Sequence, residues 1–167
     1  MSGFTLMELM VVIALIGITL FLTLPRLRAG LAGEPTLKTA RQIIYLAQQL
    51  RSEALSKQKE FMLQIDLDEQ RFGFSVKNDV EKGEPDGSDK GPLSHHLTQD
   101  VRITDVVFPP NGKVTTGRIN IGFYRQGYAD QALVHIENTS GDQVITLMIE
   151  PFLPHIQINK GYYLWEK

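Results

Sequence analysis

The chain contains no cysteine among its 167 residues. No disulfide bond can therefore crosslink the fold, and a metal site built from cysteine thiolates is excluded. The absence does not determine the cellular compartment, because an exported domain can also lack disulfides. The length fits one modest folded domain together with a membrane segment.

An excess of charge of one sign is also missing. The formal net charge is −2, and acidic and basic residues are mixed along the chain. Proteins that bind nucleic acids or anionic surfaces usually carry a basic patch or stripe. Neither kind of partner is therefore indicated, and we predict no nucleic-acid binding.

Motifs that carry catalytic or cofactor chemistry are absent. No glycine-rich phosphate loop occurs, and the acidic loop 79–92 lacks the ligand order of a calcium-binding loop. His95 and His96 would point to opposite faces of a strand, which is unsuited to holding one metal ion. We interpret these two histidines, His135 and His155 as polar surface residues. The sequence predicts no enzyme, no cofactor and no metal site.

Charge is almost missing from residues 4–24 as well, where Glu8 is the single ionisable side chain. A helix of that length spans about 30 Å, the thickness of a bilayer's hydrocarbon core. A carboxylate at the centre of a membrane helix costs about 2.5–3.5 kcal/mol, and less near an end. The pattern predicts a transmembrane helix in which Glu8 has a function and requires a partner.

Two ordinary interpretations of this segment remain open on the residues alone. A secretory signal could be cut ahead of Gly33, although the run lacks a basic start and is longer than the usual apolar core of such signals. A plain membrane anchor could place Glu8 at the positive end of the helix dipole. The anchor interpretation gives no reason for Gly3-Phe4 ahead of Thr5-Leu6-Met7-Glu8.

The sequence Gly3-Phe4-Thr5-Leu6-Met7-Glu8 followed by a long apolar helix resembles the class III signal of type IV pilins and type II secretion pseudopilins. The resemblance implies that prepilin peptidase removes the leader 1–3 by cutting between Gly3 and Phe4 and then methylates the amine of Phe4. It also implies that Glu8 neutralises the N-terminal amine of a neighbouring subunit during filament assembly. Gly17 and Pro25 occupy the places of the family's helix-weakening residues.

Two features depart from the family pattern. The leader carries no lysine or arginine, and Arg26 and Arg28 follow the helix on the side that should be exported. That distribution opposes the positive-inside tendency. Either the natural start lies upstream, or the family's insertion route overrides the charge bias.

The remainder of the chain divides into a linker, a helix and a region of strands. Two glycines and two prolines predict a kinked linker at 25–35. Residues 36–59 have apolar side chains at spacings of three and four, which predicts an amphipathic helix. The period then changes to two, which predicts an antiparallel β domain over 60–167. Its first hairpin pairs 61–66 with 71–76, and further strands are expected at 101–108, 118–124, 132–137, 144–149 and 155–158.

The order of these elements is also that of pilins, so the predicted fold is α+β and pilin-like: a long N-terminal helix packed on a C-terminal antiparallel sheet. The passage from Arg51 to Asp66 and the segment 107–112 resemble the GspH/FimT class of minor pseudopilins. Some FimT-like proteins bind DNA through basic C-termini, but residues 161–167 here are aromatic rather than basic.

The resemblance implies a minor pseudopilin of a type II secretion system, anchored in the inner membrane by one span with its C-terminal domain in the periplasm. Implied partners are prepilin peptidase and other pseudopilins, with the secreted substrate and the outer-membrane secretin as further candidates. A minor type IV pilin and a membrane-anchored periplasmic binding domain are the alternatives. The loop 79–92 and the aromatic terminus are our candidate contact surfaces.

Overall fold

The computed structural model describes residues 6–31, 34–77, 95–110 and 112–165, and for 20–31 it describes the backbone. The chain divides into two compact units, Met1–Glu34 and Pro35–Lys167. The division falls at the first residue of the second helix. Gly3, Phe4 and the whole of the loop 79–92 lie outside the described residues.

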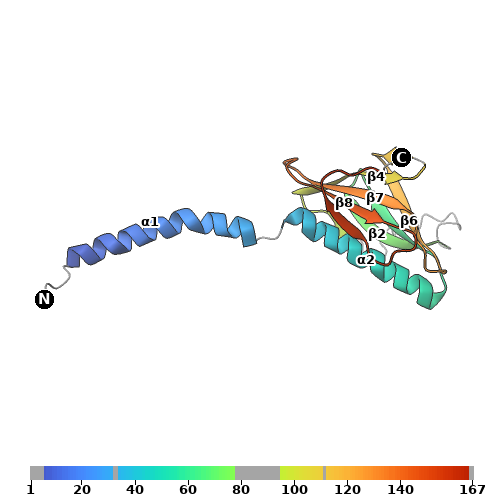
Figure 1. Ribbon diagram of the computed structural model, residues 1–167, viewed down its shortest axis with the longest axis horizontal. Helices are drawn as coiled ribbons and strands as arrows, with labels where there is room; N and C mark the ends of the chain where they lie inside the picture. The colour runs from blue at the N-terminus through green and yellow to red at the C-terminus, as the bar shows by residue number, and fades with distance from the viewer. Residues whose placement is uncertain (1–5, 32–33, 78–94, 111, 166–167) are drawn as a thin grey trace. The chain divides into compact units, whose positions relative to one another are not determined.

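The first unit contains one helix, α1, which spans Leu6–Leu31 (Figure 1). Its backbone stays helical through Pro25 and ends inside the segment 25–35, where the sequence predicts a kinked linker beginning at Pro25. Proline removes one backbone donor from a helix interior, but Leu, Arg and Ala on either side are strong helix formers. The helix therefore continues past Pro25 and ends at Leu31.

The second unit begins with α2, Pro35–Lys57, close to the predicted bounds. Pro35 occupies the first helical position, where its missing N–H would have had no intrahelical acceptor. The buried residues of the helix recur at spacings of three and four and form one face. They are Thr36, Thr39, Ala40, Ile43, Leu46, Ala47, Leu50 and Ala54.

Nine strands follow, and all their pairings are antiparallel within the described residues. The first sheet has four strands in the order β3-β2-β1-β6, and the second has five in the order β5-β4-β7-β8-β9. The bounds are β1 Phe61–Asp66, β2 Arg71–Val76, β3 His95–His96, β4 Val101–Phe108, β5 Gly112–Val114, β6 Arg118–Phe123, β7 Ala132–Asn138, β8 Val144–Ile149 and β9 Gln157–Lys160. The α+β prediction is confirmed, with two sheets in place of one.

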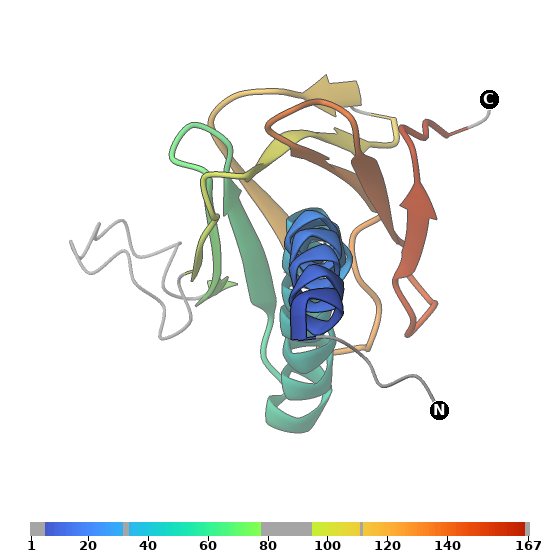
Figure 2. The same ribbon diagram turned by 90° about the vertical axis from the view of Figure 1, so that its left-hand side faces the viewer.

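The core lies between α2 and the two sheets. The helix contacts β1 and β6 of the first sheet and β4, β7 and β8 of the second. Figure 2 shows green strands of the first sheet to the left of α2 and red strands of the second sheet to its right. Ile43 and Leu50 from the helix, Leu63 from β1, and Ile136 and Leu147 from the second sheet are all at most 1 % exposed. Burial of each such side chain contributes about 1.5–3 kcal/mol.

Candidate functional site

The predicted assembly residues that the structure describes lie on α1. Glu8 is in the first turn of the helix and is exposed. A Cβ atom added at Gly17 would meet nothing within 4 Å, so the space beside this residue is open. Pro25 lies within the helical backbone. The structure thus places Glu8 and Gly17 on one continuous helix.

The side chains of α1 are exposed over the stretch 6–19. Large apolar residues account for most of them, with exposures from 43 % at Val12 to 76 % at Leu6 and Met7. Within the residues that the structure describes, no helix combines the length and apolarity needed to cross a membrane. An apolar surface of this extent is unusual on a soluble monomer and marks a site of contact with other apolar groups.

No group of three metal-ligating side chains occurs among the described residues. His96 and His155 are exposed, and His95 is half-buried beside Phe72 with ring centroids 5.2 Å apart. The prediction that all four histidines lie on the surface is wrong for His135, which is 0 % exposed. A histidine pointing away from the core can still be buried when another segment covers it.

His135 stands in a cross-strand row with Asp105 of β4 and Thr146 of β8, since both residues are its direct partners in the sheet. A β-bulge between Ile103 and Asp105 makes this row. Because the extra residue changes the phase of β4, Ile103 and Val106 both face the core while Asp105 faces the other side with His135. Without the bulge, Asp105 and His135 would lie on opposite faces.

The C-terminal residues 161–165 cover this row, and we call them the C-terminal strap. The Nδ1 atom of His135 is 2.7 Å from Oδ1 of Asp105, and its Nε2 atom is 2.7 Å from the carbonyl oxygen of Tyr163. The ring of Tyr162 stacks on the imidazole with centroids 3.9 Å apart. The strap is therefore attached at a buried histidine.

Thr146 attaches the strap at a second point. Its hydroxyl donates to the carbonyl oxygen of Gly161 at 2.6 Å and accepts from the N–H of Tyr163 at 3.2 Å. The N–H of Gly161 donates to the carbonyl of Val144 at 2.7 Å. The outward side of the strap leaves Tyr162, Tyr163 and Leu164 44 %, 46 % and 59 % exposed. The aromatic terminus that the sequence singled out is thus fixed in place and partly accessible.

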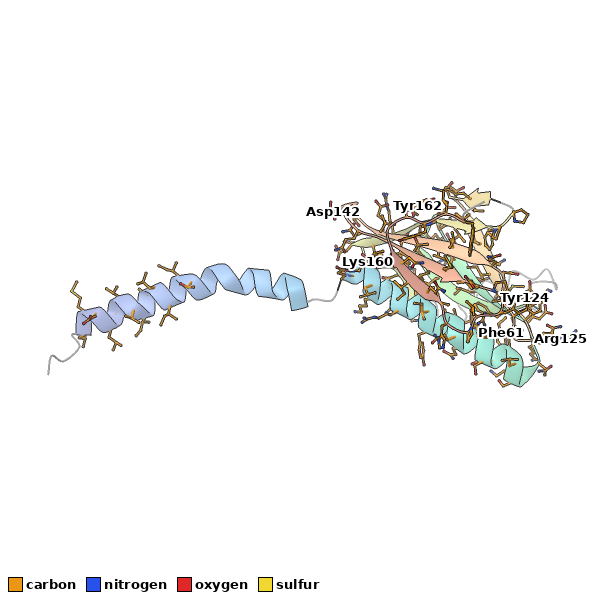
Figure 3. The ribbon with its side chains drawn as sticks, in the orientation of Figure 1. Phe61, Tyr124, Arg125, Asp142, Lys160 and Tyr162 are labelled. Atoms are coloured by element: carbon orange, nitrogen blue, oxygen red, sulfur yellow. The ribbon has the colours of Figure 1, made fainter. Side chains whose placement is uncertain are left out.

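Lys113 of β5 forms an ion pair with Asp105. Its ammonium group lies 3.2 Å from Oδ2 of Asp105 and donates to the hydroxyl of Tyr162 at 2.9 Å. That hydroxyl donates to Oδ1 of Asp105 at 3.2 Å. The hydrogen bond to Tyr162, followed by that to Asp105, raises the pKa of Lys113 above its ordinary value. Tyr162 lies apart from Tyr124 and Phe61 (Figure 3), so this cluster is separate from the aromatic residues near the C-terminal end of α2.

Sequence reasoning missed this cluster for an identifiable reason. The apolar residues of β4 follow a period of two at Val101 and Ile103 and resume out of phase at Val106. Such a phase change indicates a bulge, and it would have placed Asp105 on the outer face. The pairing of Asp105 with His135 depends on strand register and could not be read from the sequence.

These features define a protein class by fold: an amphipathic helix on antiparallel sheets, preceded by an apolar helix with an acid in its first turn, which is the pilin-like α+β architecture. Among solved structures, the chain is similar to two of the minor pseudopilin EpsH from the type 2 secretion system of Vibrio cholerae. One matches with a TM-score of 0.57 at 15 % identity, covering 76 % of this chain and 98 % of that one. The other matches with a TM-score of 0.58 at 14 % identity, covering 75 % and 95 %. Comparisons with protein-family models and with curated proteins give no match.

Proposed function

We propose that this protein is a minor pseudopilin, a structural and non-enzymatic subunit of the short filament of a type II secretion system. The observation that carries the proposal is the combination of an EpsH-like fold with the class III signal at residues 3–8. The fold alone would suit many functions. The signal alone would suit any pilin-like protein. The fold and the signal together favour a minor pseudopilin.

Processing is the first element of the proposal. Prepilin peptidase cuts between Gly3 and Phe4 and methylates the new amine, which makes methylated Phe4 the first residue of the mature chain. Mass spectrometry of the protein purified from membranes tests this directly. A mature chain that begins at Met1 or at Gly33 contradicts the proposal, as does a chain that is cut normally in cells without the peptidase.

Assembly is the second element. The exposed apolar side chains of α1 pack against the helices of neighbouring subunits, and the Glu8 carboxylate pairs with the amine of a neighbour's Phe4. A carboxylate in an apolar bundle is costly unless it is paired, so this contact favours one register of the helices. Gly17 and Pro25 weaken the helix locally and let it adapt to the filament.

The Glu8→Gln variant tests the assembly step because it keeps the side-chain shape and removes the charge. We expect normal membrane insertion and loss of incorporation into filaments, measured by crosslinking and by co-purification with other pseudopilins. Thr19→Ala, a change on the same exposed helix, serves as the control and should assemble normally. Normal incorporation of Glu8→Gln would contradict the proposed role.

Localisation follows from the same proposal: the chain crosses the inner membrane once, with residues 35–167 in the periplasm. Protease added to spheroplasts should digest this part while a cytoplasmic marker stays intact. Secretion assays separate the pseudopilin from a minor type IV pilin. Deletion of the gene should block export of a secreted protein across the outer membrane and leave pili intact, whereas the opposite result assigns the chain to a pilus.

A further inference from the structure

We propose that His135 carries protons on both ring nitrogens in the folded protein, and that this second proton holds the C-terminal strap, residues 161–165, against the second sheet. The strap is in this sense a proton-dependent latch. The inference is independent of the filament role proposed above, because it rests on contacts within residues 35–167.

The imidazole ring of His135 makes two short polar contacts. Each ring nitrogen lies 2.7 Å from an oxygen atom, one belonging to the Asp105 carboxylate and the other to the Tyr163 carbonyl. Both oxygens are acceptors, so each contact needs a proton between the two atoms. A neutral imidazole supplies one N–H, and an imidazolium supplies two. The geometry therefore requires one proton more than a neutral histidine beside a carboxylate provides.

The charges around Asp105 place that proton on the ring. Oδ2 of Asp105 faces the Lys113 ammonium group at 3.2 Å, and Oδ1 accepts from the Tyr162 hydroxyl at 3.2 Å. A carboxylate can accept hydrogen bonds from Lys113, from Tyr162 and from the ring at the same time. A proton bound to the carboxyl group would occupy a position on one of its oxygens and leave fewer positions for these donors. The Tyr162 ring stacks on the imidazole at 3.9 Å, which also favours a cation there.

The other elements around the ring contribute no competing base among the described residues. β8 presents the hydroxyl of Thr146, and the strap presents the Tyr163 carbonyl and the Tyr162 hydroxyl. Further along the same strands, the Glu137 carboxylate is paired with Arg102 at 3.2 Å. When the second proton makes the His135 ring a cation, its ion-pair partner is therefore the Asp105 carboxylate.

Loss of the second proton would set an imidazole lone pair against one of the two acceptors at 2.7 Å. The N–H that remains would stay with the charged partner, Asp105, because hydrogen bonds to charged groups are the stronger ones. The Tyr163 carbonyl would then face a lone pair in a buried position, and that part of the strap would detach. The latch is closed below the pH at which the ring loses this proton and open above it.

Trp165 reports on the latch, because it is the one tryptophan of the chain and lies on the strap. The experiment uses the full chain in detergent micelles, uniformly labelled with ¹⁵N. Long-range ¹H–¹⁵N spectra give the protonation of both His135 ring nitrogens, and tryptophan emission gives the state of the strap. The pH is raised from about 5, below the ordinary histidine pKa, until the spectra show loss of the second proton.

We expect both ring nitrogens to be protonated at the low-pH end, and the emission to shift to longer wavelength at the pH where the second proton leaves. The proposal would be overturned if one His135 ring nitrogen is unprotonated while the tryptophan emission still has the wavelength of the closed strap. Loss of the proton without a change in emission would also overturn it.

Three variants separate the latch from general stability. In Asp105→Asn the amide N–H₂ can donate to Nδ1 of a neutral His135, so the strap should stay closed across the pH range and the emission shift should disappear. In His135→Gln the emission should remain at the longer wavelength at every pH. His155→Gln, at an exposed position, should behave as the wild type. An Asp105→Asn protein that keeps the wild-type emission shift would contradict the latch even if His135→Gln fails to fold.

Discussion

Asp66 shows how a single carboxylate can organise a turn in this fold. It is the last residue of β1, and its Oδ1 atom accepts from the N–H of Glu69 at 2.9 Å in the turn that leads to β2. Arg118 and Arg71 lie 3.4 and 3.6 Å from its other oxygen. The hydrogen bond from Glu69, followed by the hydrogen bond from Arg118 and the charges of both arginines, lowers the pKa of Asp66 below its ordinary value.

Replacing Asp66 with Asn should therefore destabilise the protein by roughly 1–2 kcal/mol at neutral pH, since hydrogen bonds to a charged group are lost. A lowered folded-state pKa means that this stability is present above the unfolded-state pKa and is lost as the pH falls through the folded-state value. Urea unfolding at a series of pH values should show the gap between wild type and variant closing in acid. Asp142→Asn, in an exposed turn, is the control, and a pH-independent gap would contradict the assignment.

Gly122 of β6 is a second position at which a single added atom should change the stability of the fold. A Cβ atom there would lie 2.8 Å from Oδ2 of Asp130 and 2.8 Å from the Tyr124 hydroxyl. Neither group can retreat freely, because Asp130 accepts from the N–H of Gly122 at 2.7 Å and from Tyr124 at 3.0 Å. These hydrogen bonds hold Asp130 and Tyr124 in the space that a Cβ atom of residue 122 would occupy.

Gly122→Ala should cost about 1–3 kcal/mol through overpacking. The same change at Gly17 adds a methyl group into open space and should leave the unfolding of residues 35–167 unaltered. Thermal unfolding of both variants measures the difference. Equal melting temperatures for the two would show that Asp130 and Tyr124 yield without cost.

At the scale of elements, helical periodicity predicted α2 well because its buried face is regular. Ala40, Ile43, Ala47 and Leu50 are buried as the stripe predicts. Leu55 also belongs to the apolar stripe that the sequence predicts over 36–59, but it is 47 % exposed near the helix end. Periodicity identifies a face, but it does not tell how far along the helix the partner sheet extends.

Arg51 ties α2 to the loop between β8 and β9. Its guanidinium donates to the carbonyl oxygens of Glu150 at 3.0 Å, Pro151 at 3.2 Å and Leu153. These acceptors lie far from Arg51 in the chain, and the planar guanidinium reaches them with two nitrogens. The contact fixes a loop that carries the 85 % exposed Phe152.

Arg51→Lys should loosen this loop, since an ammonium group cannot reproduce the forked geometry. We expect a loss of roughly 1–2 kcal/mol in stability and faster cleavage by chymotrypsin at Phe152. Arg41→Lys on the exposed face of α2 is the matched control. Unchanged cleavage in Arg51→Lys would mean that the loop is held by other contacts.

Strand prediction succeeded where a strand was long enough to show its period. The hairpin of β1 and β2 and the strands β4 and β8 have the predicted bounds, and β6, β7 and β9 differ at one or both ends. The sequence missed β3 and β5, which have two and three residues. A strand this short has no measurable alternation, and it exists because a neighbouring edge supplies hydrogen bonds.

At the scale of the whole molecule, the division into two sheets could not be predicted. β1 pairs with both β2 and β6, and β4 pairs with β7, which requires contacts between distant segments. Local sequence indicates where strands lie and which side of each is apolar, but it does not specify the partner. The class α+β followed from the order of the elements.

For the proposed processing and assembly residues, the sequence supplied more information than the structure did. Gly3, Phe4 and Glu8 were singled out from the sequence because their proposed role rests on a short motif, and the structure adds the exposed position of Glu8. The buried cluster of Asp105 and His135 was invisible for the converse reason: it is made by register and by a covering segment, and no motif signals it.

Residues 35–167 should fold without the first unit. The core cluster of the described residues draws on α2 and the strands, and the side chains of 6–19 are exposed. A chain that starts at Pro35 should keep the near-UV circular dichroism of the full protein, and its free energy of unfolding should change by no more than about 0.5 kcal/mol. A molten or unfolded product would show that the first unit contributes to the core.

The two sheets share no ladder among the described strands, yet both close over the same helix. Neither sheet can therefore separate from α2 without uncovering residues that the other sheet also needs. In native-state hydrogen exchange, the central strands β1 and β7 should then exchange through one common opening with a single free energy, although they belong to different sheets. Residues 35–167 would therefore respond to mechanical or chemical stress as one cooperative block.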